Sequence, residues 1–312
     1  MGRRGDAVIR TESLTKSYGR ARGIVDLSLE VERGEVFGFL GPNGAGKTTT
    51  IRTILDFIRP TAGRATVLGL DSVRDSVEIH RRTGYLPGEL ALWERMTGRE
   101  LLEYLGSLRG GLDRAAVDRL DERLDVDLDR RIGDLSHGNR TKLGLIVAFA
   151  HRPDVVILDE PTQGLDPLVQ QEFYRLVEET RDDGRTVFLS SHVLPEVERV
   201  CDRVGAIREG RLAAVERVAD LAARAVRHVT IRFAGPVPLD AFRALDGVSA
   251  VRVDGDALRL TAGGPIDALV KTAARFEVRD LVSEKPNLEE LFLALYGRQE
   301  PAEAPAEATG GG

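Results

Sequence analysis

The chain has 312 residues, of which 42% are hydrophobic and 30% charged, and its formal net charge is −6. This length suits about two domains with a sizeable core. The acidic balance argues against a generalised nucleic-acid binder, and a single cysteine, Cys201, excludes an internal disulfide and a cysteine-based metal cluster. The longest apolar stretch, around residues 143–150, is far short of the roughly 20 residues that a membrane-spanning helix needs. We therefore expect a membrane role only through a partner.

The N-terminal residues 1–6 are basic and lead into a strand-like run at 7–9, without the apolar core and cleavage site of a signal peptide. The single cysteine agrees with a reducing compartment. Together these features predict a protein that stays inside the cell.

Residues 1 to about 215 alternate short β-rich runs with helical stretches, which is typical of an α/β domain with a buried, largely parallel sheet. Three short apolar runs, each followed by polar or glycine-rich residues, are candidates for central strands: 36–40, 155–158 and 186–190. The carboxyl ends of such strands face a ligand. Residues 88 to about 151 contain several helical patterns and no good strand, so we predict a helical subdomain inserted there.

After Gly210 the pattern of the sequence changes. Alternating and helical runs then follow in the order β–α–β–β–α–β, at 229–233, 239–245, 251–253, 258–260, 266–274 and 276–282. This order predicts a small ferredoxin-like α+β domain over residues 216–297.

The end of the chain holds two further segments. Asn287 and Glu290 can cap a helix, and its apolar face is expected to dock onto its own domain. The members of that face are Leu288, Leu291, Phe292 and Leu295. Residues 298–312 are rich in Pro, Ala, Glu and Gly, and are predicted to form a disordered tail.

The strongest motif lies between the apolar run at 36–40 and a helical run at 49–58. It is a full match to the phosphate-binding loop pattern, Gly41-Pro42-Asn43-Gly44-Ala45-Gly46-Lys47-Thr48. Glycines let consecutive backbone N–H groups point at a polyphosphate, and the helix that starts near Thr49 adds a partial positive charge. In this pattern Lys47 reaches the β- and γ-phosphates and the Thr48 hydroxyl binds Mg²⁺. The motif predicts a site for a nucleotide with Mg²⁺.

Two carboxylates, Asp159 and Glu160, follow the apolar run at 155–158. Adjacent side chains at a strand end point in different directions, so they can have different tasks. Asp159 is placed to hold Mg²⁺, directly or through water, and Glu160 is free to polarise an attacking water. A third strand ends in Ser190-Ser191-His192, which brings a hydrogen-bonding side chain to the same edge.

Together these residues resemble the nucleotide-binding subunit of an ABC transporter over about residues 5–215. The decisive segment is similar to the signature of that family and precedes the acidic strand: Leu135-Ser136-His137-Gly138-Asn139. The resemblance implies an α/β fold of the P-loop NTPase, ABC-type class with a helical insertion. It also implies a head-to-tail dimer with a second copy, in which Ser136 and Gly138 contact the γ-phosphate of ATP bound to the opposite subunit. A serine hydroxyl and a helix N-terminus suit a phosphate.

Other positions also match the family. Tyr18 is similar to the aromatic residue that stacks on adenine, and the loop 164–167 to the segment that joins the two active sites across the dimer. The resemblance implies that Glu160 is the general base and that His192 contacts the γ-phosphate and steadies the attacking water. With Lys47, these two residues form the catalytic set that we expect.

Two segments depart from the family pattern. Gly88 stands where the family usually has a glutamine that contacts Mg²⁺ or water and links the site to the membrane subunit. Glu89 can substitute for it, or coupling relies on the backbone, and the sequence leaves both options open. His137 and Asn139 replace the commoner glycine and glutamine of the signature, which leaves Ser136 and Gly138 intact.

The single cassette, the two variant segments and the appended C-terminal domain resemble bacterial drug- or antibiotic-exporter ATPases. The resemblance implies a subunit at the cytoplasmic face of the membrane that hydrolyses ATP to power transport through a separate permease, with no nucleic-acid partner. A cytosolic ATPase of this superfamily that acts on DNA or ribosomes is the alternative, but it usually has two cassettes or a long coiled coil, and the sequence shows neither. A weakly hydrolysing regulator is disfavoured by Asp159, Glu160 and His192. Residues 216–297 carry no recognisable chemistry, which favours a structural or regulatory role.

Overall fold

The computed structural model describes residues 7–19, 21–224 and 227–284. The chain divides into two compact units, Met1–Val218 and Ala219–Gly312. Each unit has its own sheets and its own core, so each is described by itself.

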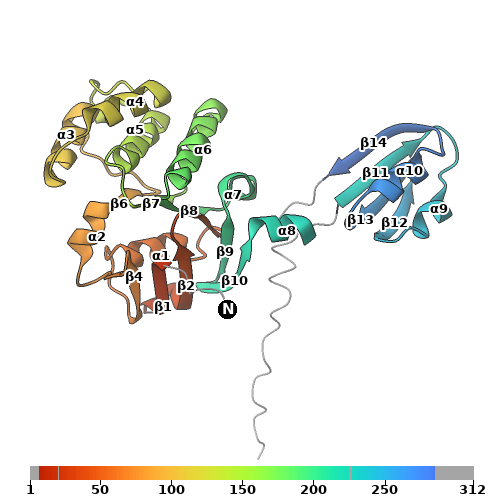
Figure 1. Cartoon of the computed structure of the whole chain (residues 1–312), viewed down its shortest axis with the longest axis horizontal. Coiled ribbons are helices and arrows are strands. Elements are labelled where there is room, and N and C mark those ends of the chain that lie inside the picture. Colours follow the sequence, from red (N-terminus) through yellow and green to blue (C-terminus); the bar gives the residue numbers. More distant parts are fainter. Residues whose placement is uncertain (1–6, 20, 225–226, 285–312) are drawn as a thin grey trace, which may run out of the picture. The chain divides into compact units, whose positions relative to one another are not determined.

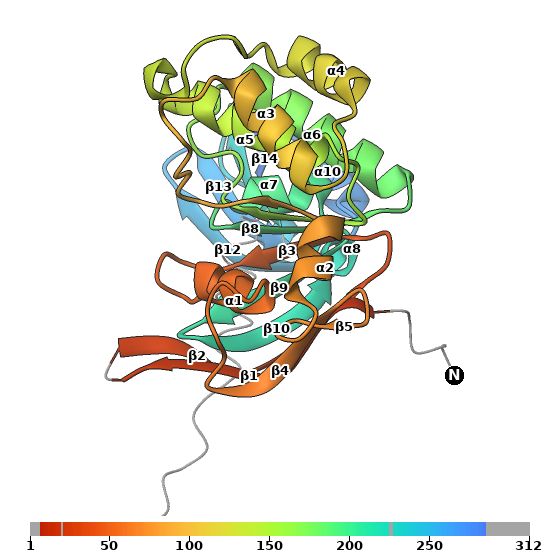
Figure 2. The same cartoon turned by 90° about the vertical axis from the view of Figure 1, so that its left-hand side faces the viewer.

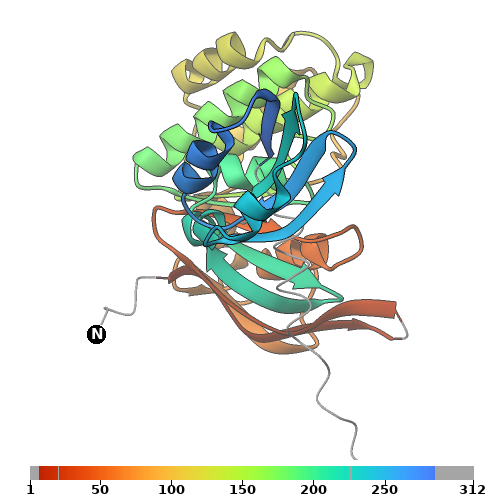
Figure 3. The ribbon, with the colours of Figure 1, turned by 90° about the vertical axis from the view of Figure 1, so that its right-hand side faces the viewer.

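A six-stranded sheet forms the centre of the first unit, in the order β10-β9-β3-β8-β7-β6. Its strands are β3 (Val36–Leu40), β6 (Thr83–Leu86), β7 (Val155–Asp159), β8 (Thr186–Ser191), β9 (Arg203–Arg208) and β10 (Arg211–Arg217). All neighbours pair in parallel except β9 and β10, which form an antiparallel hairpin, drawn in teal in Figure 3. Every residue of β3, β7 and β8 is buried. The predicted parallel sheet is therefore present. Its three central strands are buried on both faces, as the continuous apolar runs in the sequence indicated.

A second sheet, which the sequence analysis did not anticipate, is antiparallel and has the order β2-β1-β4-β5. It consists of β1 (Ala7–Tyr18), β2 (Ala21–Glu32), β4 (Ala62–Val67) and β5 (Leu70–Asp71). Helix α1 (Lys47–Ile54) lies between this sheet and the central sheet (Figure 2). Its Ile51 and Ile54 are buried in one core with side chains from β1, β2 and β3. This packing fixes the position of α1, which begins a few residues after the end of β3.

The predicted helical insertion contains α3 (Gly98–Leu108), α4 (Arg114–Leu124), a short 3-10 turn at Ile132–Asp134 and α5 (His137–Phe149). Helix α3 begins with a capping box, in which Thr97 accepts from the Glu100 backbone N–H and the Glu100 carboxylate accepts from that of Thr97. Together with α6 (Pro167–Asp182), these helices form a group on one side of the central sheet (Figure 1). Two shorter helices, α2 (Ser76–Arg82) and α7 (Leu194–Val200), complete the unit.

The second unit has a four-stranded antiparallel sheet in the order β12-β13-β11-β14. Its elements are β11 (Arg227–Phe233), α9 (Leu239–Arg243), β12 (Val248–Asp254), β13 (Ala257–Ala262), α10 (Asp267–Ala273) and β14 (Val278–Glu284), preceded by α8 (Val218–Arg224). Ile231, Phe242 and Leu258 are fully buried in its core. Helices α9 and α10 belong to the same unit as the sheet, as Figure 1 shows. The helix expected near 287–295 and the tail expected at 298–312 lie outside the described residues.

Candidate functional site

Three neighbouring strands bring the predicted site residues to one edge of the central sheet. β3 pairs with β8, so that Leu40 lies opposite Ser191, and β8 pairs with β7, so that Ser190 lies opposite Asp159. The chain then continues from these strand ends into the loop 41–48, Glu160 and His192. The edge is therefore where backbone N–H groups, a lysine, two carboxylates and a histidine meet.

The loop 41–48, called the phosphate loop below, has the backbone that its glycines permit. Gly44 and Gly46 have φ angles of 78° and 111°, in a region that other residues rarely adopt. Lys47 is buried, and its Nζ donates to the carbonyl of Gly41 at 2.6 Å. Helix α1 starts at Lys47 without a side-chain cap, so its first N–H groups remain directed into the loop. This arrangement suits an anion of the size of a phosphate.

Asp159 lies at the end of β7 with one oxygen paired and one left over. Its Oδ1 accepts from Ser190 Oγ at 2.5 Å. Its Oδ2 is buried and has no hydrogen-bond partner in the described part of the chain. A buried carboxylate oxygen without a donor suits a cation, and Mg²⁺ usually takes one or two carboxylates together with oxygens of the substrate phosphates. The Asp159 carboxylate thus fits Mg²⁺, and Thr48, the second residue of α1, stays a predicted ligand. The described residues contain no cluster of three His, Cys, Asp or Glu side chains that could hold a metal alone.

Glu160 follows Asp159 and contacts different residues. Its Oε1 lies 3.0 Å from Lys47 Nζ, and its Oε2 lies 2.7 Å from His192 Nδ1. The backbone of Glu160 has a φ of 52°, which costs a non-glycine residue on the order of 1–2 kcal/mol. Its N–H bonds to the Ser190 carbonyl at 3.2 Å, which holds this turn in place. The structure thus brings together Lys47, Glu160 and His192, the three predicted catalytic residues.

Ser136 and Gly138 lie on a different element. Ser136 is exposed and caps helix α5 by accepting from the Asn139 N–H at 3.3 Å. Helix α5 belongs to the helical insertion, whereas the phosphate loop precedes α1 between the two sheets (Figure 2). His137 lies against the loop 164–167, because a Cβ added at Gly164 would come within 2.5 Å of its ring. The signature segment and that loop therefore adjoin each other within one chain.

The remaining predicted positions are close to the surface. The Tyr18 ring is 46% exposed, and Lys16 Nζ lies 5.3 Å from its centroid. Gly88 adjoins Asp159, since a Cβ added there would lie 3.4 Å from Asp159 Oδ2. Glu89 is exposed. A side chain at residue 88 would thus lie beside the Asp159 carboxylate, and the glycine leaves that space open.

The sequence analysis missed one residue beside the site, Glu196 of α7. Its carboxylate is buried and accepts from Ser191 Oγ at 2.8 Å and from Thr162 Oγ1. A charged residue on a short helix gives no sign of burial by its type, because most glutamates are exposed.

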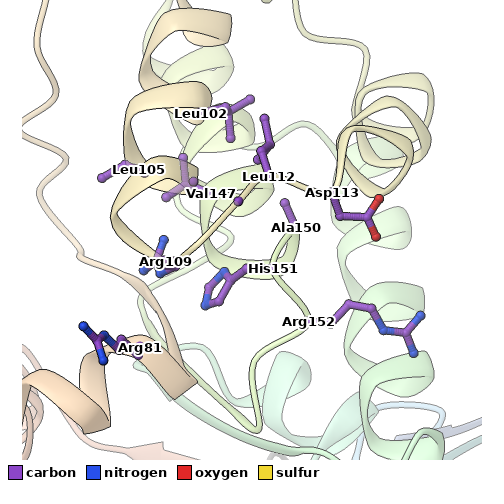
Figure 4. Close-up of a pocket in the computed structure, with 12 residues that line it drawn as sticks. Arg81, Leu102, Leu105, Arg109, Leu112, Asp113, Val147, Ala150, His151 and Arg152 are labelled. Atoms are coloured by element: carbon purple, nitrogen blue, oxygen red, sulfur yellow. The ribbon is translucent and has the colours of Figure 1, made fainter.

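A separate cavity of about 230 Å³ lies at the C-terminal ends of α3 and α5 (Figure 4). Arg81, Arg109 and His151 line it together with the leucines of α3. Burial, and secondarily the charge of Arg109, lower the pKa of His151 to about 4. The cavity has a cationic rim, and its lining includes no residue of the phosphate loop.

Comparisons with known proteins agree with this geometry. A family model described as ABC transporter matches residues 24–163. The linearmycin resistance ATP-binding protein LnrL of Bacillus subtilis (strain 168) is 32% identical over 93% of this chain and 99% of its own length. The daunorubicin resistance ATP-binding protein DrrA3 of Streptomyces coeruleorubidus is 36% identical over 94% of this chain and 96% of its own.

Solved structures give the same result for the first unit. A structure described as the ATP-binding subunit of an ABC transporter superposes with a TM-score of 0.64 at 29% identity, covering 69% of this chain and 91% of that one. A dimeric ATP-binding cassette bound to ADP and phosphate is 20% identical with a TM-score of 0.62, which shows the shared fold. With the phosphate loop, the acidic strand end and the signature segment in place, the chain belongs to the ABC transporter family as an ATP-binding subunit and ATPase.

Proposed function

We propose that this subunit hydrolyses ATP with Glu160 as general base and thereby powers the export of a drug or antibiotic-like compound through a separate membrane permease. The observation that carries the hydrolytic role is the Glu160 carboxylate, held between Lys47 Nζ at 3.0 Å and His192 Nδ1 at 2.7 Å at the mouth of the phosphate loop. Hydrolysis requires the base to lie within hydrogen-bond reach of the attacking water, which must itself lie next to the bound γ-phosphate.

Each residue around the nucleotide has a defined task in this proposal. The backbone N–H groups of the phosphate loop and the start of α1 hold the phosphates, and Tyr18 stacks on the adenine. Mg²⁺, held by Thr48 and Asp159, would neutralise charge on the phosphates. Lys47 exchanges Glu160 for the β- and γ-phosphates, because a polyphosphate offers it a stronger partner than a single carboxylate.

Release from Lys47 leaves Glu160 free to accept a proton from water. His192 is bonded to Glu160 through Nδ1 and, in this proposal, steadies the water or the γ-phosphate. A general base of this kind contributes about 10²–10⁴-fold to the rate.

A second copy of the chain completes each site in this proposal. Ser136 caps α5 and Gly138 lies in its first turn, on a different element from the phosphate loop, and Ser136 is exposed. A head-to-tail dimer would place the start of α5 of one copy on the γ-phosphate held by the other, where a helix N-terminus favours an anion.

We propose that the permease contacts the surface around Trp93 and Tyr104, which come after Gly88 in the sequence. Trp93 and Tyr104 are 54% and 46% exposed and contact each other edge to face, with ring centroids 5.6 Å apart. Exposed aromatic residues of this kind are enriched at protein interfaces. No helix of the described residues could span a membrane. A peripheral position at the cytoplasmic face of the membrane, on a permease, follows from this proposal.

Export rather than import is supported by the similarity to a linearmycin resistance and a daunorubicin resistance ATP-binding protein. For residues 216–297, most of which lie in the second unit, we propose a ferredoxin-like accessory domain. Its strand order and its β–α–β–β–α–β succession support this fold.

Replacement of Glu160 by Gln tests the hydrolytic role. We expect Glu160→Gln to keep ATP binding in calorimetry and to lower kcat by about 10²-fold or more, because the amide cannot take a proton. The bound ATP should then hold a dimer that is visible by size-exclusion chromatography with light scattering. Lys47→Ala is the matched control, which should lose tight ATP binding itself. Turnover close to wild type in Glu160→Gln would contradict the assignment.

A further inference from the structure

Glu196 is a buried carboxylate that the roles proposed above leave unused. Its residue is 8% exposed, whereas Glu198 and Arg199 on the same helix are exposed. A carboxylate taken out of water costs several kcal/mol unless hydrogen bonds compensate. A buried acid on a surface helix therefore needs specific partners, and Glu196 has two.

The two partners come from the segments that carry Glu160 and His192. One carboxylate oxygen accepts from Ser191 Oγ at 2.8 Å, and Ser191 directly precedes His192. The other accepts from Thr162 Oγ1, and Thr162 is separated from Glu160 only by Pro161. Ser191 Oγ also accepts from the Val193 N–H at 2.9 Å, which fixes the turn around His192. Glu196 therefore joins the two loops at points one and two residues from the proposed catalytic pair.

We propose that Glu196 is a positioning residue for hydrolysis, which holds the two loops so that the Glu160 carboxylate and the His192 ring stay in contact. This inference rests on the roles proposed for Glu160 and His192. The His192 side chain is 42% exposed, so surrounding atoms constrain it little, and Glu160 is its hydrogen-bond partner. Fixing the backbone of both loops through one carboxylate sets the 2.7 Å contact. A displacement of about 1 Å in such a pair can cost about 10²-fold in rate.

The chemistry of the contact explains which substitutions keep it. Both partners are hydroxyls, and each carboxylate oxygen of Glu196 accepts a hydrogen bond from one of them. A glutamine can accept from one hydroxyl and donate to the oxygen of the other, since hydroxyl protons rotate. A leucine has a similar size and offers neither. Glu196→Gln should therefore preserve the link, and Glu196→Leu should break it without leaving a cavity.

The experiment compares full-length Glu196→Leu, Glu196→Gln and Glu198→Leu in ATPase assays, ATP-binding calorimetry and thermal unfolding. We expect Glu196→Leu to lower kcat about 10- to 100-fold with KM and ATP affinity changed less than about twofold. Glu196→Gln should restore kcat to within about threefold of wild type, because it rebuilds both hydrogen bonds. Glu198→Leu, an exposed site two residues along the same helix, should leave kcat unchanged.

If Glu196→Leu fails to fold, Thr162→Val and Ser191→Ala remove the two arms of the contact singly, and each should lower kcat with KM retained. Folded Glu196→Leu with wild-type kcat would overturn the proposal, and so would equal losses in the Leu and Gln variants. Glu160→Gln separates the two levels. If it abolishes turnover while Glu196→Leu does not, only the positioning role is wrong. If it turns over normally, the general-base assignment itself fails.

Discussion

At the scale of single residues, the site depends on two unusual backbone positions. Glu160 adopts a φ of 52°, and Gly46 one of 111°. Non-glycine residues in such conformations are concentrated at functional sites, where surrounding contacts maintain the strain. At Glu160 those contacts are the Ser190 carbonyl, Lys47 and His192. The turn directs the carboxylate of Glu160 toward Lys47, while Asp159 stays on the buried side.

Gly88 leads to a prediction at the same scale. A Cβ at this position would lie 3.4 Å from Asp159 Oδ2, an ordinary contact, so a side chain fits without strain. We expect Gly88→Gln to fold and to bind Mg²⁺ in the presence of ATP about tenfold more tightly, because its amide oxygen can reach the metal or a water on it. Titration of Mg²⁺ against the thermal stability of the ATP-bound protein measures this.

Gly88→Ala is the matched control, since it adds the Cβ without the amide. Equal Mg²⁺ affinity in Gly88→Gln and Gly88→Ala would show that the amide does not reach the metal. In that case the open space beside Asp159 is not a missing ligand position.

At the scale of elements, the helical insertion carries a half-buried histidine at its end. His151 follows α5 and lines the cavity with Arg81, Arg109, Asp113 and Arg152 around it (Figure 4). Burial, then Arg109, lower the pKa of His151 from 6.5 to about 4. The folded state therefore resists protonation of this ring, while the unfolded chain takes up a proton near pH 6.5.

The stability of the first unit should consequently depend on His151. Protonation of this ring should leave the free energy of unfolding unchanged above pH 6.5. It should lower that free energy by up to about 3 kcal/mol as the pH falls toward 4, because only the unfolded chain takes up the proton. We expect the midpoint of urea unfolding to fall less between pH 7 and pH 4.5 in His151→Leu than in the wild type, because leucine cannot take up a proton in the unfolded chain. Urea denaturation at pH 7 and pH 4.5 checks this. A parallel loss of stability in wild type and His151→Leu would contradict it.

At the scale of the whole molecule, the proposed nucleotide site belongs to one of the two units. The residues that we propose to bind the nucleotide lie in the unit Met1–Val218, and the second unit has its own core around Ile231, Phe242 and Leu258. A ligand stabilises the state that binds it, by about 2.7 kcal/mol at a concentration 100 times its Kd. That stabilisation belongs to the elements that unfold together with the site.

Hydrogen exchange should therefore separate the two units. We expect ATP with Mg²⁺ to slow exchange in β3, α1 and β7, and to leave β11 and β13 unchanged in the monomeric protein at low concentration. Lys47→Ala should abolish the slowing without altering the exchange of the second unit. Equal protection of both units by ATP would mean that they unfold as one.

Much of the site was predictable because its chemistry is local in the sequence. The phosphate loop needs consecutive glycines followed by a lysine, and the acids need only a buried strand before them. The positions of Lys47, Asp159 and Glu160 follow from such short segments. Continuous apolar runs likewise marked β3, β7 and β8, since each is buried on both faces. The antiparallel sheet was missed because β1 and β2 are long, irregular strands with several register shifts.

The sequence by itself thus determined which groups are present and on which strand ends they lie. Only the tertiary structure decided how these groups pair. Contacts of Glu160 with Lys47 and His192 join residues 113 and 32 positions apart, and those of Glu196 with Thr162 join residues 34 apart. Such pairs depend on strand order and on the packing of α7, which no local pattern contains. Burial similarly changed Glu196 and His151 from ordinary surface types into groups with specific environments.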